Sequence, residues 1–268
     1  MTGAPKAEKA LLLIAVFLVF LFVVMLVPGL SLMLGVLIPV PLTFVYVRFG
    51  RRVGLVFLTM VFMVLFILVG PKQAILFFTE YGVLAGVMAE TIRFRLSFDR
   101  CILFSALVSA MLSIALLLFV FSDRESTPLD FFKKQIDGHF AQSIETLKTM
   151  GDKSEELKVL QDFSGKASDS LVQAYPSFIA LGTFITALIN FYSTRFLWRR
   201  VGSEDIFCHE RFSGWTVPDQ VIWVLIGSST VFLLTNNILG TIGLNFLLIT
   251  LVAYFFQGLA ITIFFLES

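Results

Sequence analysis

Eight polar side chains in strongly apolar stretches of this chain have the chemistry to serve a function. A charged or amide group is costly inside hydrocarbon, so such residues usually bind a ligand or pair within the protein. They are two carboxylates and six hydroxyl or amide residues: Glu80, Glu90, Tyr175, Thr186, Asn190, Asn245, Tyr254 and Gln257. We predict that they line a ligand pocket. The alternative is that they form hydrogen bonds between helices and hold a bundle together.

The two carboxylates do not form a catalytic pair. Glu80 and Glu90 are about 15 Å apart along a helix, too far to act on one bond. We expect Glu90 to pair with Arg93 or Arg95, whereas Glu80 has no obvious partner nearby in the sequence. We therefore predict no catalytic residues and a protein that is not an enzyme.

The amide and hydroxyl residues fall on helical stripes. Thr186 and Asn190 are four residues apart, on one polar face of an otherwise apolar segment that should point into the bundle. In the last apolar segment, Tyr254 and Gln257 share one side and Asn245 lies nearly opposite. Gln257 sits deep, so its amide must find partners in protein or in a cavity.

No motif predicts a metal or a cofactor. His139 and His209 are isolated, and Cys208, His209 and Glu210 lack the ligand spacing of a closed zinc site. The chain has no phosphate-binding glycine loop and no nucleophile elbow. An ATP-driven process would therefore need a separate ATPase module on another chain.

Apolar segments long enough to cross a bilayer must position these residues. The chain has 268 residues, is 57% hydrophobic and 15% charged, and has a mean hydropathy of +0.91. A helix crosses the hydrocarbon in roughly 20 apolar residues. The segments are 10–27, 30–47, 53–70, 74–91, 101–121, 171–194, 217–236 and 243–265. They predict an all-α polytopic transmembrane bundle of about eight helices, with Pro39 and Pro41 kinking the second.

Basic residues in the short loops predict the orientation, because Lys and Arg concentrate on the cytoplasmic side. With the N-terminus inside, the outer short loops receive only Lys72. The inner side receives Lys6, Lys9, Arg48, Arg51, Arg52, Arg93, Arg95, Arg100, Arg195, Arg199, Arg200 and Arg211. We predict a multi-pass membrane protein with both termini in the cytoplasm. A net charge of +1 gives no case for a nucleic-acid partner.

One long polar stretch divides the chain. Residues 122–170 are predicted to form an extracytoplasmic amphipathic helical hairpin, because apolar residues recur there at steps of three and four. It separates an N-terminal bundle of five helices, residues 1–121, from three C-terminal helices, residues 171–268. The hairpin would lie on the membrane face or pack on the bundle, or serve as a lid or partner-docking element.

The C-terminal half also resembles a known family. Five short motifs resemble the YybS-like family of bacterial membrane proteins of unknown function. They are Tyr175-Pro176, the Arg195–Arg200 run, Val217-Pro218-Asp219, Gly243-Leu244-Asn245 and Tyr254–Ala260. That family is distantly similar to the substrate-binding (S) components of energy-coupling-factor transporters. The resemblance implies a protein of the bacterial inner membrane with an outward-opening ligand pocket. It also implies, as partners, other membrane subunits and a separate ATPase module.

Three functions are compatible with these observations. The leading hypothesis is a non-enzymatic ligand-binding or transport component that resembles an S component. The second is a structural or accessory subunit of a membrane assembly, with the polar stripes holding helices together. The third is a lipid-handling protein, since a Phe-rich surface and the kinked second helix could host an acyl chain; Phe occurs 31 times.

Overall fold

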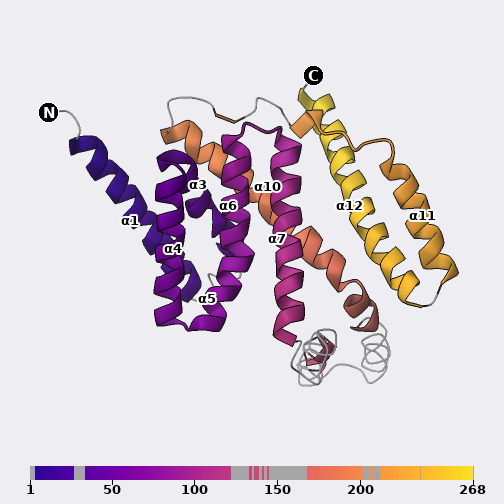
Figure 1. Ribbon diagram of the computed structural model, residues 1–268. Helices are drawn as coiled ribbons and strands as arrows, with labels where there is room; N and C mark the ends of the chain where they lie inside the picture. The colour runs from indigo at the N-terminus through magenta and orange to yellow at the C-terminus, as the bar shows by residue number, and fades with distance from the viewer. Residues whose placement is uncertain are drawn as a thin grey trace. The chain divides into compact units, whose positions relative to one another are not determined.

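The computed structural model is an all-α polytopic helical bundle (Figure 1). It describes residues 4–26, 34–121, 133–134, 136–138, 141, 144, 168–201, 206–207, 212–235 and 237–267. Within these residues, five helices are long and apolar enough to cross a membrane: Arg51–Leu68, Ala74–Arg93, Phe98–Leu116, Tyr175–Val201 and Ile238–Leu266. Three shorter apolar helices are Leu13–Val24, Gly35–Phe49 and Val221–Leu234. Together they match the eight predicted segments one to one.

The chain forms two compact units. The first contains residues 1–113 and 182–211, and the second contains residues 114–181 and 212–268. Helices α7 (Phe98–Phe121) and α10 (Tyr175–Val201) contribute to both units. Most of the predicted 122–170 hairpin lies outside the described residues.

Helix α3 (Pro39–Phe49) is the centre of the first unit. It packs against α4 (Arg51–Leu68) and α6 (Val83–Arg93), as Figure 1 shows, and every residue from 39 to 47 is buried. The surrounding core is Leu21, Val24, Ile38, Leu42, Val45, Phe57, Val61, Leu65, Ala74, Phe77 and Ala85. A helix that is buried on all sides needs no polar face, which explains why only Thr43 and Tyr46 carry polar groups between residues 39 and 47.

The predicted kink is a break between two helix types. A 3₁₀ turn, η1 (Gly35–Leu37), precedes α3. Pro39 has no N–H for the Gly35 carbonyl, which instead accepts the N–H of Ile38 at 3.0 Å. Pro41 likewise cannot donate to Leu37. The two prolines therefore prevent a regular α-helix through this segment.

A second irregularity interrupts the neighbouring span. Helix α5 (Pro71–Phe77) continues as the π-helical segment η2 (Phe78–Gly82) and then as α6. Such π segments are rare and often occur at functional sites. Glu80 lies in η2.

Tight corners join the first helices. Gly50 connects α3 to α4 with φ +89°, and Gly70 connects α4 to α5 with φ +107°. Glycine adopts these left-handed conformations without steric cost. The Gly50 corner, the 94–97 loop and the C-terminal end of α10 lie at the upper edge of Figure 1. The described arginines of the first unit cluster there, at what we call the basic end.

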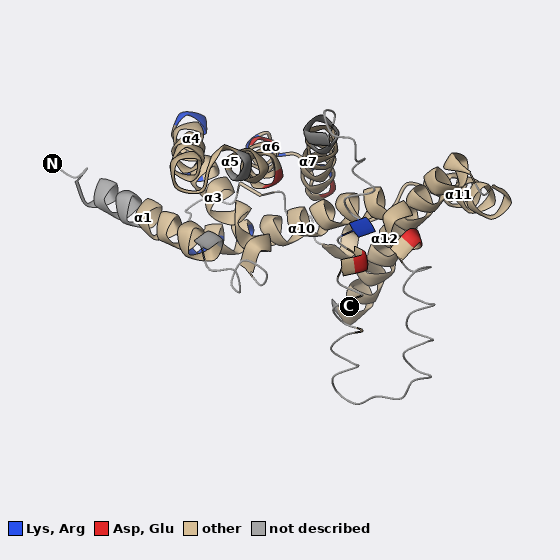
Figure 2. Cartoon of the chain, turned by 90° about the horizontal axis from the view of Figure 1, so that it is seen from below, with Lys and Arg blue, Asp and Glu red and all other residues tan. Residues whose placement is uncertain are grey.

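The second unit contains a helical hairpin, α11 (Val221–Leu234) and α12 (Ile238–Glu267), preceded by η3 (Phe212–Gly214). A Cβ on Gly243 would lie only 2.8 Å from the Phe232 nitrogen, so the two helices touch through their backbones. Figure 2 shows that the described helices of both units carry few charged residues along their length.

Candidate functional site: a broken helix beside an apolar groove

Asn190 on α10 satisfies a backbone group that the helix break leaves open. Its side chain is fully buried, and Nδ2 donates to the Val36 carbonyl at 2.7 Å and to the Thr186 carbonyl at 2.6 Å. Val36 belongs to η1, where its 3₁₀ donor would be Pro39, which has no N–H. Asn190 therefore fastens α10 to the break. Its Oδ1 atom is buried and has no hydrogen-bond partner within the described part of the chain.

Helices α3 and α10 run in the same direction from this contact. Two helical turns after the Val36–Asn190 bond, toward the C-terminal end of each helix, the rings of Phe44 and Trp198 lie 6.0 Å apart. One turn further, the Arg48 guanidinium lies 5.3 Å from the centre of the Trp198 ring. The contacts follow the same order along both helices, so both helices reach the basic end with their C-terminal turns.

An apolar groove of about 540 Å³ lies beside the break, between α1 (Ala4–Leu26), α3 with η1, and α10. It is lined by Val16, Phe17, Phe20, Leu37, Val40, Pro41, Tyr192, Ser193, Phe196 and Leu197. Only two of these side chains, Tyr192 and Ser193, carry a polar group. The volume is typical of a small-molecule site, roughly 300–1,000 Å³.

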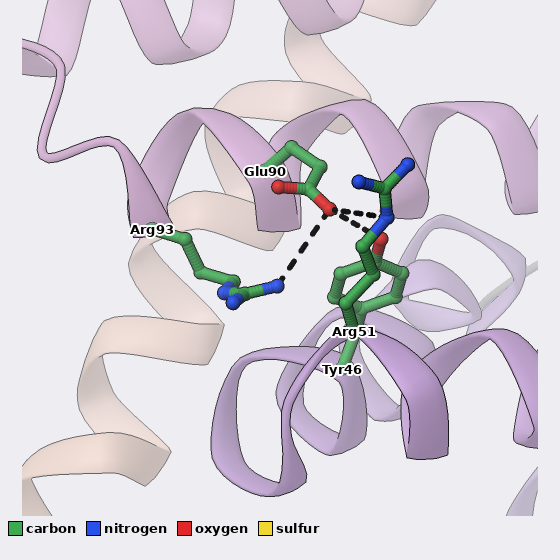
Figure 3. Close-up of polar contacts among 4 residues, drawn as sticks. All are labelled: Tyr46, Arg51, Glu90 and Arg93. Carbon is green, nitrogen blue, oxygen red and sulfur yellow. Dashed lines mark hydrogen bonds and ion pairs between the residues drawn. The ribbon is translucent and has the colours of Figure 1, made fainter.

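Glu90 joins three helices at the basic end (Figure 3). Its Oε1 atom accepts a hydrogen bond from the Tyr46 hydroxyl at 2.5 Å. The same oxygen lies 3.5 Å from Nε of Arg51 and 3.7 Å from Nη1 of Arg93. The expected pairing with Arg93 is therefore present, whereas Tyr46 and Arg51 were not predicted as partners. Glu90 therefore links α3, α4 and α6 through one carboxylate oxygen.

The tyrosine reaches Glu90 because it lies flat on a glycine. A Cβ on Gly54 of α4 would be 2.4 Å from the Tyr46 ring and 2.6 Å from the Tyr46 Cα. Only glycine leaves room for the tyrosine there. Helices α3 and α4 are therefore in backbone contact just beneath the Gly50 corner.

Glu80 is an exposed residue of the first unit. Its backbone carbonyl accepts a hydrogen bond from Ser109 of α7 at 3.4 Å. The adjacent Tyr81 approaches the helix break, since a Cβ on Gly35 would lie 3.8 Å from its hydroxyl oxygen. The Tyr81 hydroxyl of the π segment therefore lies near Gly35 of η1, and the sequence did not single out this tyrosine.

Asn245 has the same kind of role in the second unit. Its Oδ1 accepts the Ser177 N–H at 2.8 Å, in the first turn of α10. Its Nδ2 donates to the Gln173 carbonyl and to the Thr241 carbonyl, both at 2.8 Å. The first turn of a helix has N–H groups without partners, so Asn245 acts as a cap supplied by α12.

The eight predicted residues are therefore divided between the two units. Glu80, Glu90, Thr186 and Asn190 belong to the first unit, and Tyr175, Asn245, Tyr254 and Gln257 belong to the second. Of the second group, Tyr175 begins α10, and Tyr254 and Gln257 are half-buried on α12. Thr186 contributes only its carbonyl, to Asn190.

The groove itself was missed. Its lining residues look like ordinary lipid-facing residues in the sequence, and the single available signal was the proline pair Pro39 and Pro41. Among the described residues, no group of His, Cys, Asp or Glu side chains could hold a metal ion.

Comparison with known proteins gives one result. A family model described as "Predicted membrane protein (DUF2232)" matches residues 15–268. No curated protein and no solved structure matches the chain. The match is compatible with the resemblance to YybS-like proteins.

Proposed function

The chain belongs to this family of predicted membrane proteins, and from that premise we propose that it binds the hydrocarbon chain of a membrane lipid. The site is the groove between α1, α3 and α10. The observation that carries this proposal is the groove's volume of about 540 Å³ combined with its almost entirely apolar lining. Both are properties that suit an acyl chain rather than a polar ligand.

Three of the predicted polar residues support the same choice, because their hydrogen bonds or charge pairs lie away from the groove. The Asn245 amide bonds backbone atoms through both its oxygen and its nitrogen, and Asn190 donates through Nδ2 to two backbone carbonyls. Glu90 is matched by Tyr46 and two arginines. A vitamin-like ligand would need several convergent donors and acceptors, and the groove offers only Tyr192 and Ser193.

This proposal joins two of the functions that the sequence suggested. Ligand binding without catalysis agrees with the S-component hypothesis, while the ligand is that of the lipid-handling alternative. Transport would require a partner, such as other membrane subunits with a separate ATPase module. We place the protein in a bacterial inner membrane with its basic end in the cytoplasm, because of the bias in arginine positions.

Filling the groove tests the proposal. Ser193→Trp places a large ring among the lining residues and should remove co-purifying lipid, measured by native mass spectrometry of the full chain in mild detergent. Ile185→Trp is the matched control, since Ile185 lies two turns earlier on α10, is 42% exposed and does not line the groove. Equal lipid occupancy in both variants and the wild type would refute a groove-bound chain.

A further inference from the structure

We infer that the groove selects a phospholipid with an anionic head, whose phosphate is held by Arg200 and Arg48 at the basic end. This inference rests on the proposed function, because it assigns a polar end to the same ligand. A lipid bound in the groove needs a polar contact of this kind to hold it there. A lipid tail leaving the bilayer gains no hydrophobic free energy, because the surrounding tails are as apolar as the groove.

Arg200 continues the groove-lining face of α10. Side chains three and four residues apart share one face of a helix, so Ser193, Phe196 and Leu197 lead directly to Arg200 one turn later. The contact confirms this spacing, since the Arg200 guanidinium lies 4.8 Å from the centre of the Phe196 ring. Phe196 is itself part of the groove wall. A cation therefore stands at the groove's edge.

Arg48 does the same on α3. Val40 lines the groove, and two steps of four residues lead from it through Phe44 to Arg48. The Arg48 side chain is exposed and stacks on Trp198 of α10. Because α3 and α10 run in the same direction, Arg48 and Arg200 reach the same end of the groove.

Neither arginine is neutralised by a carboxylate that the structure describes. Ion pairs that the structure describes involve Arg51, Arg93 and Lys133, and none of these pairs includes Arg48 or Arg200. Glu90 at the basic end is matched by Arg51 and Arg93. A guanidinium stacked on an aromatic ring keeps its N–H groups available, and they match a phosphate in planar, bidentate geometry.

The position of these arginines favours a phospholipid over a soluble phosphate. Both lie at the basic end, where the long apolar helix α4 begins and α6 and α10 end. We take this end to be at the depth of the lipid headgroups, and basic pockets between membrane helices bind anionic headgroups. The groove leads from that level into the membrane-spanning part. One ligand, with a phosphate at the arginines and an acyl chain in the groove, satisfies both features.

Two lipids with identical acyl chains test the inference. The full chain in mild detergent would be titrated with phosphatidylglycerol or phosphatidylcholine and bound lipid counted by native mass spectrometry. We expect the wild type to prefer phosphatidylglycerol. Arg200→Gln and Arg48→Gln should each weaken phosphatidylglycerol by about fivefold, the contribution of one basic residue at a membrane surface. Phosphatidylcholine should weaken less, because its own quaternary ammonium partly neutralises its phosphate, so the preference for phosphatidylglycerol should shrink in both variants.

Arg52→Gln is the matched control, because Arg52 is exposed at the same end but belongs to α4, a helix that contributes no residue to the groove lining. An equal loss in that variant would attribute the preference to net charge and overturn the inference. Displacement of the lipid by inorganic phosphate alone would also overturn it, as a phosphate site independent of lipid.

The proposed function and this inference fail differently. If both lipids bind equally well and Ser193→Trp abolishes both, the groove stands and the headgroup inference falls. If neither lipid binds the wild type, or Ser193→Trp changes nothing, the proposed function itself falls.

Discussion

Asn190 shows how a fully buried amide can stabilise the contact between two helices by hydrogen bonding a backbone group. It supplies a donor to the Val36 carbonyl at a break that two prolines impose. Asparagine serves well here because one side chain can donate to a neighbouring helix and to its own helix at once. The unpartnered Oδ1 atom is the remaining cost of this arrangement.

Replacing Asn190 should loosen the first unit. Asn190→Leu leaves the Val36 carbonyl without this donor, which should lower the free energy of unfolding by about 1–2 kcal/mol, within the range for buried hydrogen bonds in proteins and membranes. Thermal unfolding in detergent measures the change. Thr186→Val is the control, since Asn190 bonds the Thr186 carbonyl and not its hydroxyl. A Leu variant as stable as the control would show that the bond contributes nothing.

At the scale of elements, contacts between helices depend on glycines placed at close approaches. Gly54 lies beneath Tyr46, and the tyrosine reaches across to Glu90 from that position. The contact therefore couples α3 and α4 to α6. The contact requires that position 54 has no side chain, so a substitution at that position should disturb it.

Gly54→Ala should destabilise the protein although alanine is the better helix former. The added Cβ would lie 2.6 Å from the Tyr46 Cα, and a backbone atom cannot move aside cheaply. We expect a loss of about 1–3 kcal/mol, typical of overpacking. Gly86→Ala on α6 meets no atom within 4 Å and should be neutral or gain up to about 1 kcal/mol. Equal melting temperatures for the two variants would contradict this reading.

The sequence predicted the helices well and their irregularities only in part. All eight predicted apolar segments contain helices, because a backbone in lipid must satisfy its own hydrogen bonds, but only five of the described helices are long enough to cross the membrane. Pro39 and Pro41 indicated the break at α3, because proline lacks a donor. No residue signalled the π segment at 78–82, since its sequence is compatible with a regular helix.

The candidate site was harder to predict for a physical reason. The sequence identified Asn190 and Asn245 as buried polar residues, but which backbone atoms need them depends on where helices break and begin. The groove is apolar within an apolar protein, so its lining has no compositional contrast. Glu90 was the exception, because Arg93 lies one turn away on the same helix.

At the scale of the whole molecule, the arginines predict which end faces the cytoplasm. In a background with Cys101 and Cys208 replaced by alanine, Arg52→Cys should react with a membrane-impermeant maleimide only after the cells are permeabilised. Val69→Cys, beside the opposite corner at Gly70 and 41% exposed, should react in intact cells. The reverse pattern would invert the topology and place Arg48 and Arg200 at the outer leaflet.

The enclosure of α3 releases it from the rule that membrane thickness sets helix length. The eleven residues of α3 extend about 16 Å, roughly half of the thickness of the hydrocarbon layer. A single helix of this length in lipid would expose the unpaired backbone groups at its ends to acyl chains. In this protein the N-terminal end of α3 packs against α10 instead, and Asn190 donates to the Val36 carbonyl the hydrogen bond that lipid could not provide. Helix α3 is therefore surrounded mainly by protein rather than by lipid, and only the helices around it need a length that matches the thickness of the bilayer.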